Sequence, residues 1–171
     1  MHDRLANLLG AASIAVTDLV LSGATGAGGV GPTGAAALVV LSNAPDLGVT
    51  ELGRRVGLTQ SAAARMVDGL QAAGLARRRP GGGRAVHVRL TPKGEDAVRA
   101  MLDARDAPLA EALAVLDEDE RETLTGLLAT LLARLYEQIG DSELMCLCDR
   151  RCCTAGAVCP VGQAERDAGG E

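Results

Sequence analysis

Residues 48–94 read GVTELGRRVGLTQSAAARMVDGLQAAGLARRRPGGGRAVHVRLTPKG, and their pattern predicts the order of helices and strands in the middle of the chain. It opens with a short amphipathic segment in which Leu52 and Val56 share one helical face. We expect Thr50 to cap this helix, because a threonine hydroxyl can accept a hydrogen bond from a free backbone N–H of the first turn. Gly57 is expected to end the helix.

The next segment predicts a second helix over residues 60–73, capped by Thr59 and stopped by Gly74. Its side chains separate by type onto two faces, as in a helix with one buried side. The inward set is Ala63, Val67 and Leu70, and the outward set is Gln60, Ser61, Ala64, Arg65 and Asp68. Two short helices joined by a tight turn, the second polar on its outer face, predict a helix-turn-helix.

A β-hairpin is predicted after the second helix. Val86, Val88 and Leu90 alternate with polar residues, which is the period of a strand with one buried face, and residues 80–83 form the tip. The arginines around this tip are Arg77, Arg78, Arg79 and Arg84. Helix, turn, helix and basic hairpin, in this order, predict a winged helix-turn-helix.

Helical periodicity continues on both sides of this stretch. A first helix from Leu5 is expected to end in the glycine-rich run 23–31, which we predict to be a loop, and Pro32 is expected to begin the next helix. After the hairpin, helical spacing returns from Lys93, with an expected kink at Pro108.

Asp117 and Glu120 form the pattern of a capping pair that begins the last long helix. This helix carries a wide aliphatic stripe: Leu124, Leu127, Leu128, Leu131, Leu132, Leu135 and Ile139. A stripe of this width usually buries against more than one neighbour. It is either the core helix of a monomer or a subunit interface, and we favour the interface.

The expected fold class is therefore mainly α with a small β-hairpin wing: a winged helix-turn-helix plus a helical dimerisation region. Residues 32–92 are assigned to the winged helix-turn-helix DNA-binding domain. Residues 1–31 and 93–140 form the helical dimerisation region, and residues 141–171 form a Cys-rich C-terminal tail.

Charge is distributed unevenly along the chain. The formal net charge is −5, yet residues 49–99 carry ten Arg and Lys against four Asp and Glu, a local charge of +6. The remaining residues carry seven basic against eighteen acidic side chains, a charge of −11. A basic segment that coincides with a helix-turn-helix favours binding to double-stranded DNA.

The DNA-contacting residues follow from this geometry. Small polar residues at the start of a recognition helix can approach base edges without a clash, and an arginine one turn later can reach a phosphate or a guanine edge. A glycine-rich wing allows its arginines to enter the minor groove. The predicted contacts are Gln60, Ser61, Ala64, Arg65, Arg77, Arg78, Arg79 and Arg84. Asp68 is expected to face Arg65 or the protein.

Residues 48–94 resemble the core of the MarR family, in which the recognition helix leads into a wing that ends in V-x-L-T-x-x-G, here Val88 to Gly94. The resemblance implies a homodimer on a pseudo-palindromic operator, acting as a repressor that a small molecule or an oxidant releases. It places Arg65 and Arg84 on DNA-contacting positions. Gly82 stands where the family often has an aspartate that braces the wing, so a less rigid wing is expected.

The resemblance also implies an effector crevice between the dimerisation and DNA-binding lobes. Tyr136 is the only aromatic residue of the chain. The crevice is therefore expected to be lined without aromatic side chains, Tyr136 excepted. The sequence does not identify a ligand.

The cysteines cluster in one place. All five lie between positions 146 and 159: Cys146, Cys148, Cys152, Cys153 and Cys159. Three explanations compete: a thiolate site for Zn or an iron–sulfur cluster, a redox-sensing dithiol, and a tail without a role. We favour the metal site, because clustered thiolates repel one another unless a cation or oxidation relieves them.

The other function classes fit less well. An enzyme or a thiol- and metal-binding protein acting through the Cys cluster is the alternative, but the two histidines, His2 and His87, have no evident catalytic partner. Asn7, Thr17 and Asp18 interrupt the apolar N-terminal stretch, so no membrane span or signal peptide is expected. We expect a cytoplasmic regulator, not an enzyme.

Overall fold

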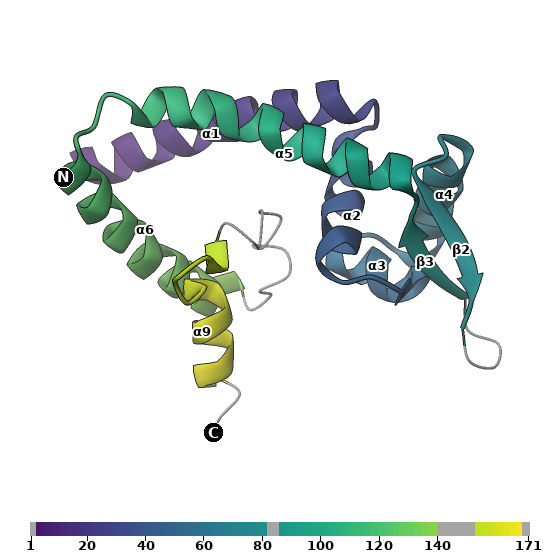
Figure 1. Cartoon of the computed structure of the whole chain (residues 1–171). Coiled ribbons are helices and arrows are strands. Elements are labelled where there is room, and N and C mark those ends of the chain that lie inside the picture. Colours follow the sequence, from purple (N-terminus) through teal and green to yellow (C-terminus); the bar gives the residue numbers. More distant parts are fainter. Residues whose placement is uncertain (1–2, 82–85, 140–152, 169–171) are drawn as a thin grey trace.

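The computed structural model describes residues 3–81, 86–139 and 153–168. As predicted, the chain is mainly helical with a small antiparallel sheet (Figure 1). The elements are α1 (Arg4–Gly28), α2 (Pro32–Asn43), β1 (Leu47–Gly48), α3 (Val49–Arg55), α4 (Gln60–Ala72), β2 (Ala76–Pro80), β3 (Val86–Leu90), α5 (Pro92–Leu113), α6 (Glu118–Ile139) and α9 (Pro160–Ala168).

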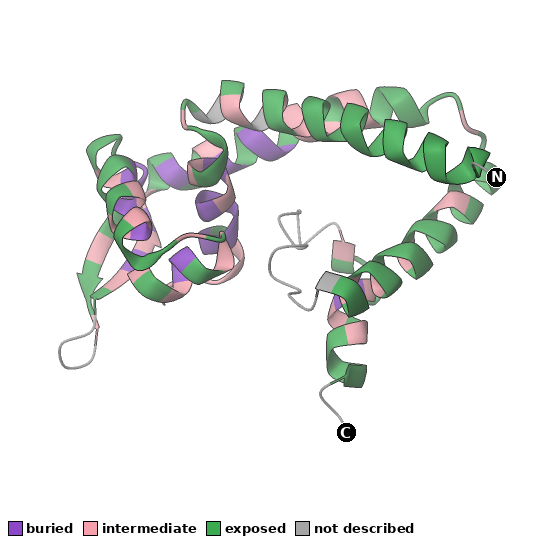
Figure 2. Ribbon diagram, turned by 180° about the vertical axis from the view of Figure 1, so that it is seen from behind, coloured by how far each residue is buried: buried purple, intermediate pink, exposed green. Residues whose placement is uncertain are grey.

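The hydrophobic core lies in one lobe, formed by α2, α3, α4, the sheet and the first half of α5. Figure 2 shows the buried residues concentrated there, whereas the long helices are largely exposed. The largest fully buried side chains are Leu38, Leu41, Leu52, Met101, Val67 and Val88. Each element of the lobe contributes to this core except the short strand β1, whose Leu47 packs against it from the edge. The lobe therefore holds the helix-turn-helix and the hairpin as one packed unit.

The sheet has the strand order β1-β3-β2, and all its pairs are antiparallel. The hairpin β2–β3 was predicted, but β1 was not. With two residues, β1 is too short to show a period-two pattern, and it is defined only by its pairing of Leu47 with Val88 and of Gly48 with His87. This pairing joins the segment after α2 to the base of the wing.

The helix termini confirm two predicted caps and correct a third. The Thr59 hydroxyl accepts a hydrogen bond from the N–H of Ala62 at the start of α4. Asp117 and Glu120 form a reciprocal capping box before α6. The prediction for Thr50 was wrong: α3 begins at Val49, with Gly48 as its N-cap, because strand β1 runs directly into the helix.

The prediction of a loop over residues 23–31 was also wrong. Helix α1 continues to Gly28 and ends at Gly29, which adopts a left-handed conformation. Tertiary packing overrides the low helix propensity of glycine here, because α1 and α5 lie side by side along most of their length (Figure 1). Only residues 29–31 remain to connect α1 to α2.

A close approach between α1 and α5 explains one of these glycines. A Cβ atom at Gly23 would lie 2.6 Å from the carbonyl oxygen of Ala104. Pro108, four residues later in α5, has no N–H to donate to that carbonyl. Helix α5 continues through Pro108, which leaves the Ala104 carbonyl without its helical donor. The backbone of α1 packs against this carbonyl group at Gly23. The site therefore requires a residue without a side chain.

The long helices expose much apolar surface in the single chain. On α6, Leu127, Leu128, Leu131, Leu132 and Leu135 are all exposed, and α1 shows the same property with Leu5, Leu8, Leu9, Ile14 and Val16. Residues Arg4–Gly23 have a mean hydropathy of 1.6 and are long and apolar enough to cross a membrane by length and composition. We expected no membrane span because polar residues interrupt the apolar run. The mean hydropathy of the window is high nevertheless, since an average allows a few polar residues. The mostly buried core helix of a soluble protein and a signal sequence near the N-terminus pass the same test, and these residues lie near the N-terminus and are not buried in the single chain.

In the described part of the tail, one helix lies against the long helices. Helix α9 packs against α6, and its Val161 is buried (Figure 1). The Sγ atom of Cys159, just before α9, accepts a hydrogen bond of 3.4 Å from the N–H of Gly162. The tail is therefore attached to the same helix that carries the leucine stripe.

The contact at Gly23 leads to the first testable prediction. Gly23→Ala should lower the melting temperature by several degrees, because overpacking against a backbone group costs about 1–3 kcal/mol. Gly26→Ala in the same helix is the matched control, since a Cβ there meets nothing within 4 Å. Thermal unfolding followed by circular dichroism measures both. Equal melting temperatures for the two variants would contradict the packing described here.

Candidate DNA interface

Helix α4 presents the predicted recognition surface. Gln60, Ser61 and Arg65 are exposed and Ala64 is half-buried, whereas Ala63, Val67 and Leu70 are buried in the core. The polar side chains therefore share the solvent face of the N-terminal half of α4. A helix that enters the major groove contacts base edges with this part of its surface.

Helix α3 crosses α4 closely, which fixes the turn between them. A Cβ atom at Gly53 would lie 2.5 Å from the Cβ of Ala63, so a small residue is required at both positions. The N–H of Leu58 donates a hydrogen bond of 2.8 Å to the carbonyl oxygen of Gly53. These contacts set the angle at which α4 leaves the lobe.

The register of the hairpin separates the arginines that the sequence grouped together. Arg77 pairs with Arg89, and Arg79 pairs with His87, so these four side chains share one face of the sheet. Arg78 pairs with Val88, which is fully buried, so Arg78 belongs to the opposite, inner face. The wing therefore has a basic outer face and an inner face that packs on the lobe.

Arg78 connects the wing to the recognition helix. Its Nη1 atom donates a hydrogen bond of 2.6 Å to Oδ1 of Asp68 and also bonds Oε1 of Gln71, both on α4. We predicted Arg78 as a DNA contact and expected Asp68 to face Arg65 or the protein. The structure pairs Asp68 with Arg78, so Asp68 faces the protein and not Arg65, and within the protein Arg78 positions α4 against β2. The contact of Arg78 with DNA stays a prediction. The pairing of Arg78 with the buried Val88 places Arg78 on the inner face of the sheet, and sequence periodicity does not determine this pairing.

A second ion pair, which the sequence did not reveal, lies at the base of the wing. Arg89 Nε donates a hydrogen bond of 2.8 Å to Oδ1 of Asp46, and its Nη2 bonds the other carboxylate oxygen. These hydrogen bonds, with the charges of Arg89, His87 and Arg79, hold the pKa of Asp46 below its usual value. Asp46 has a φ of 65°, a left-handed conformation that aspartate tolerates better than most residues. The pair ties the segment before β1 to strand β3.

Helix α3 neutralises part of its own charge. Glu51 accepts hydrogen bonds from Arg54 and Arg55, which lower the pKa of Glu51 to about 2. The carboxylate therefore stays ionised at any pH near neutrality. Two of the ten basic residues of the segment 49–99 are thus engaged within the protein.

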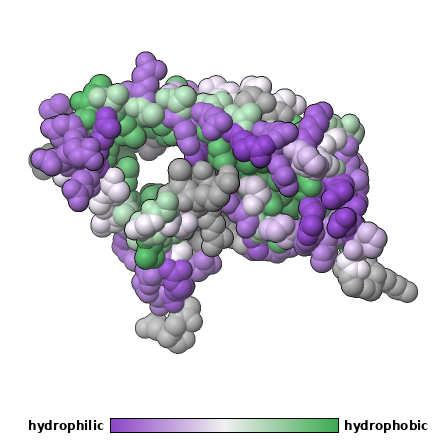
Figure 3. Space-filling model, viewed as in Figure 1, coloured by the Kyte–Doolittle hydropathy of each residue, from purple (hydrophilic) through white to green (hydrophobic). Residues whose placement is uncertain are grey.

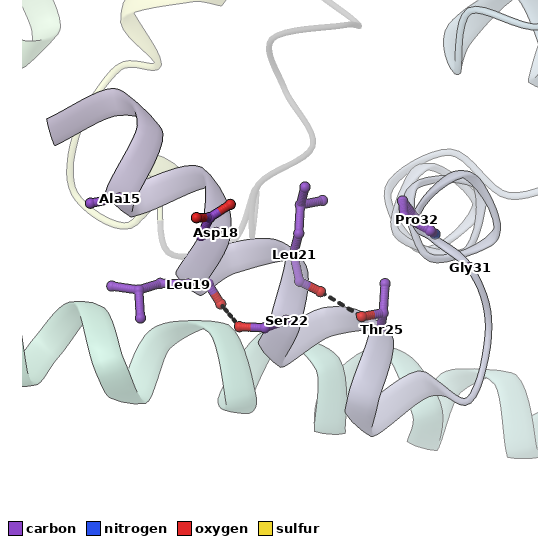
Figure 4. A pocket seen from close by; sticks show the side chains of 8 residues that line it. All are labelled: Ala15, Asp18, Leu19, Leu21, Ser22, Thr25, Gly31 and Pro32. Carbon is purple, nitrogen blue, oxygen red and sulfur yellow. Dashed lines mark hydrogen bonds between the residues drawn. The ribbon is translucent and has the colours of Figure 1, made fainter. Parts of the chain in front are cut away.

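Two hollows lie where α1 meets the start of α2. A shallow groove of about 730 Å³ has Leu19, Ser22 and Thr25 of α1 on one side and Gly31 and Pro32 on the other (Figure 4). Beside it is a small recess of about 80 Å³ between α1, α2 and α5. Its lining is apolar except for Thr25 and Arg105: Val20, Leu21, Thr25, Pro32, Ala35, Ala36, Val39, Met101, Leu102 and Arg105. Tyr136 lines neither hollow.

Some predicted site residues lie outside the described residues: Arg84, Cys146, Cys148 and Cys152. Of the cysteines within the described ranges, Cys153 and Cys159 have intermediate exposure. Within these ranges no three His, Cys, Asp or Glu side chains are grouped as metal ligands. The described part of the tail thus supplies two of the five sulfur atoms that we predicted as ligands.

Comparisons with known proteins support this interpretation of the lobe. The model of the MarR family matches residues 29–85, which span α2 to the wing. No curated protein matches the chain significantly.

Solved structures extend the likeness beyond the lobe. A probable transcriptional regulator from Pseudomonas aeruginosa is 31% identical, with a TM-score of 0.54, and the match covers 75% of this chain and 99% of that one. A MarR family protein from Bacillus stearothermophilus is 25% identical, with a TM-score of 0.69 and coverages of 79% and 98%.

A third structure shows the same fold at lower identity. MepR from Staphylococcus aureus, a transcription regulator of the multidrug efflux pump MepA, is 17% identical, with a TM-score of 0.67 and coverages of 76% and 97%. In each of these three comparisons the match covers at least 75% of this chain, so the likeness extends beyond the residues that the family model matches. The chain belongs to the MarR family of transcription regulators, whose members bind DNA.

Proposed function

We propose that this chain is a cytoplasmic, homodimeric repressor that binds a pseudo-palindromic operator and is released by a small molecule or by a change at its cysteine tail. The observation that carries the proposal is the exposed polar face of α4 beside a basic wing, in a chain of the MarR family. Gln60, Ser61, Ala64 and Arg65 would contact base edges or phosphates in the major groove. Arg84 would contact the minor groove from the wing tip.

The homodimer is supported by the exposed leucines of α1 and α6. Large apolar stripes on two long helices are unfavourable in water, and a second copy of the chain would bury both. Figure 3 shows hydrophobic side chains at the surface along the long helices, while hydrophilic ones predominate at the end that carries the sheet. The same burial accounts for the high mean hydropathy of residues Arg4–Gly23.

The effector is proposed to occupy the groove and recess between α1, α2 and α5. These hollows lie between the long helices and the DNA-binding lobe, so a ligand there can alter the angle between them. Arg105 is largely buried beside the recess and pairs with Asp106. An apolar molecule with an anionic group suits this lining, which has no aromatic residue.

For the tail, we propose a thiolate centre that holds Zn or an iron–sulfur cluster. Cys153 and Cys159 are partly exposed, and α9 attaches their segment to α6. Cys146, Cys148 and Cys152 would complete the ligand set. Because α6 carries the leucine stripe, ordering the tail can shift the spacing of the two DNA-binding lobes. A thiol enzyme is the less supported alternative, since His87 lies on the wing sheet.

Operator binding is the decisive test of the proposed function. The protein should be a dimer at micromolar concentration and should bind DNA upstream of its own gene more tightly than a random duplex, with affinity that falls steeply with salt. Arg65→Ala should weaken operator binding by about 1–3 kcal/mol, and Arg84→Ala should weaken binding with a smaller salt slope. Fluorescence anisotropy measures both. A monomer, or equal affinity for operator and random DNA, would refute the proposal.

The role of Arg78 can be separated from DNA contact by a double-mutant cycle. Arg78→Gln should weaken DNA binding, because it leaves the Asp68 carboxylate uncompensated on the recognition helix. If Arg78 acts through Asp68, adding Asp68→Asn should restore most of the lost affinity, with a coupling of about 1 kcal/mol. If Arg78 instead contacts DNA, the second substitution will not restore binding.

The tail predicts a bound metal. Protein purified without oxygen should contain close to one zinc, or the iron of one cluster, per chain, and Cys148→Ser and Cys159→Ser should each lower this content severalfold. Operator affinity should change in the same variants, because thiolate ligation and the α6 contact are coupled. Metal analysis and anisotropy under reducing and oxidising conditions test this. A metal-free protein whose affinity is unchanged under both conditions would leave the tail without the proposed role.

A further inference from the structure

The recognition helix ends in a turn that leaves two carbonyl groups for other donors. The N–H of Leu75 donates a hydrogen bond to the carbonyl oxygen of Leu70, and Gly74 has a φ of 72°. The N–H of Gly74 donates to the carbonyl oxygen of Gln71, which completes a Schellman motif. This motif does not use the carbonyl groups of Ala73 and Gly74, which lie just beyond α4.

The N-terminal end of α5 supplies both of these donors. The Thr91 hydroxyl donates a hydrogen bond of 2.6 Å to the carbonyl oxygen of Gly74. The same hydroxyl oxygen accepts a hydrogen bond of 3.1 Å from the N–H of Gly94, so it also caps α5. The Nζ atom of Lys93 donates a hydrogen bond of 2.9 Å to the carbonyl oxygen of Ala73. Thr91 and Lys93 therefore join the end of α4 to the beginning of α5.

Lys93 also brings a positive charge to the C-terminal end of α4. The last turn of α4, all of which the structure describes, has no basic side chain. The carbonyl groups at the end of a helix carry a partial negative charge, which a cation stabilises. The stem of Lys93 lies along Gly74, because its Cδ atom is 3.9 Å from the position of a Cβ at that residue. Lys93 thus contacts the end of the recognition helix through its stem and through its charge.

The backbones of the two elements also touch directly. A Cβ atom at Gly94 would overlap the carbonyl oxygen of Leu75, so the first turn of α5 packs on this residue without a side chain between them. The N–H of Thr91 donates a hydrogen bond of 3.0 Å to the same oxygen. Elsewhere α4 packs mainly against α3 and β2, whereas α5 packs mainly against α1 and α2 (Figure 1). The joint, formed by residues 73–75 and 91–94, is therefore the main direct link between α4 and α5.

The joint lies at the end of α4 that is farthest from its predicted base contacts. With 13 residues, α4 is about 20 Å long. A tilt of about 10° at the joint would therefore move Gln60 and Ser61 by about 3 Å, close to the spacing of phosphates along one DNA strand. The burial of Val67 and Leu70 holds α4 in the core, but hydrophobic burial is non-directional. The directional hydrogen bonds of the joint are suited to set the tilt.

We propose that Thr91 and Lys93 are positioning residues for operator recognition. They fix the angle between α4 and α5. In the homodimer of the proposed function, on which this inference rests, this angle sets the distance between the two recognition helices. The dimer therefore discriminates against operators whose half-site spacing differs by one base pair. In this role neither residue contacts DNA.

The test compares operators that differ only in half-site spacing. The operator is located by footprinting on the DNA upstream of the gene, and two further duplexes have one base pair added or removed at its centre. The parent protein should bind the original spacing about tenfold more tightly than either altered one. Lys93→Met keeps the stem but removes the donor and the charge, so it should lower this preference about threefold. Lys93→Arg should keep the preference.

A second pair of variants and a charge control complete the test. Thr91→Val removes the hydroxyl and should lower the preference about threefold, whereas Thr91→Ser should keep it. Arg99→Met should also keep it, because Arg99 pairs with Asp96 of the same helix and lies outside the joint. Fluorescence anisotropy measures the affinities at a temperature at which circular dichroism shows every variant folded.

The pattern of losses separates positioning from stability. A residue that only stabilises the fold would lower the affinity for all three spacings by the same factor. An unchanged preference in Lys93→Met, or an equal loss in Arg99→Met, would overturn the inference and leave the proposed function intact. A parent protein that prefers its operator to a random duplex but binds all three spacings equally would overturn it too. Equal binding of the parent protein to operator and random duplex would instead overturn the proposed function.

Discussion

The burial of Val88 in the middle of the wing sheet sets the arrangement of the DNA interface. Val88 is fully buried and lies between Leu47 of β1 and Arg78 of β2 in the antiparallel register. Because side chains alternate across a strand, this one apolar anchor directs Arg78 inward and its neighbours Arg77 and Arg79 outward. A shift of β2 by one residue would turn Arg77 and Arg79 toward the core in place of Arg78.

The same register explains how the recognition helix is held. Arg78, placed on the inner face, reaches Asp68 and Gln71 on α4. The small residues Gly53 of α3 and Ala63 of α4 allow these two helices to pack closely. The helix that enters DNA is thus fixed between a close helix crossing and an ion pair to the wing. Because α4 is held by both α3 and β2, we expect the recognition helix and the wing to move together.

The long helices follow a different constraint. In α5, Pro108 leaves the Ala104 carbonyl without its helical donor, and Gly23 of α1 packs against that group. This contact joins the N-terminal helix to the helix that leaves the wing, while the leucines of α1 and α6 remain exposed in one chain. The hollows between α1, α2 and α5 lie where these helices meet the lobe. A second chain and an effector can therefore both act on the angle between helices and lobe.

Much of this protein was predictable from local sequence patterns. The helix-turn-helix, the hairpin, the caps at Thr59 and Asp117, and the exposed face of α4 all depend on periodicity and on hydrogen bonds between residues close in the chain. Such features are encoded within a few turns of backbone, so they can be identified without the fold.

Contacts between distant residues decided the rest. Residues 23–28 belong to a helix because α1 packs against α5. Asp46 and Arg89, 43 positions apart in the sequence, meet because β1 pairs with β3. Arg78 meets Asp68 because strand register, with Val88 buried, places it on the inner face of the sheet. Local sequence patterns therefore identified the helix-turn-helix, the hairpin and the segment that carries the positive charge, but not β1 or the end of α1. The tertiary structure was needed to show which arginines face outward. Side chains alternate between the two faces of a strand, and the burial of Val88 determines which of these faces is inside.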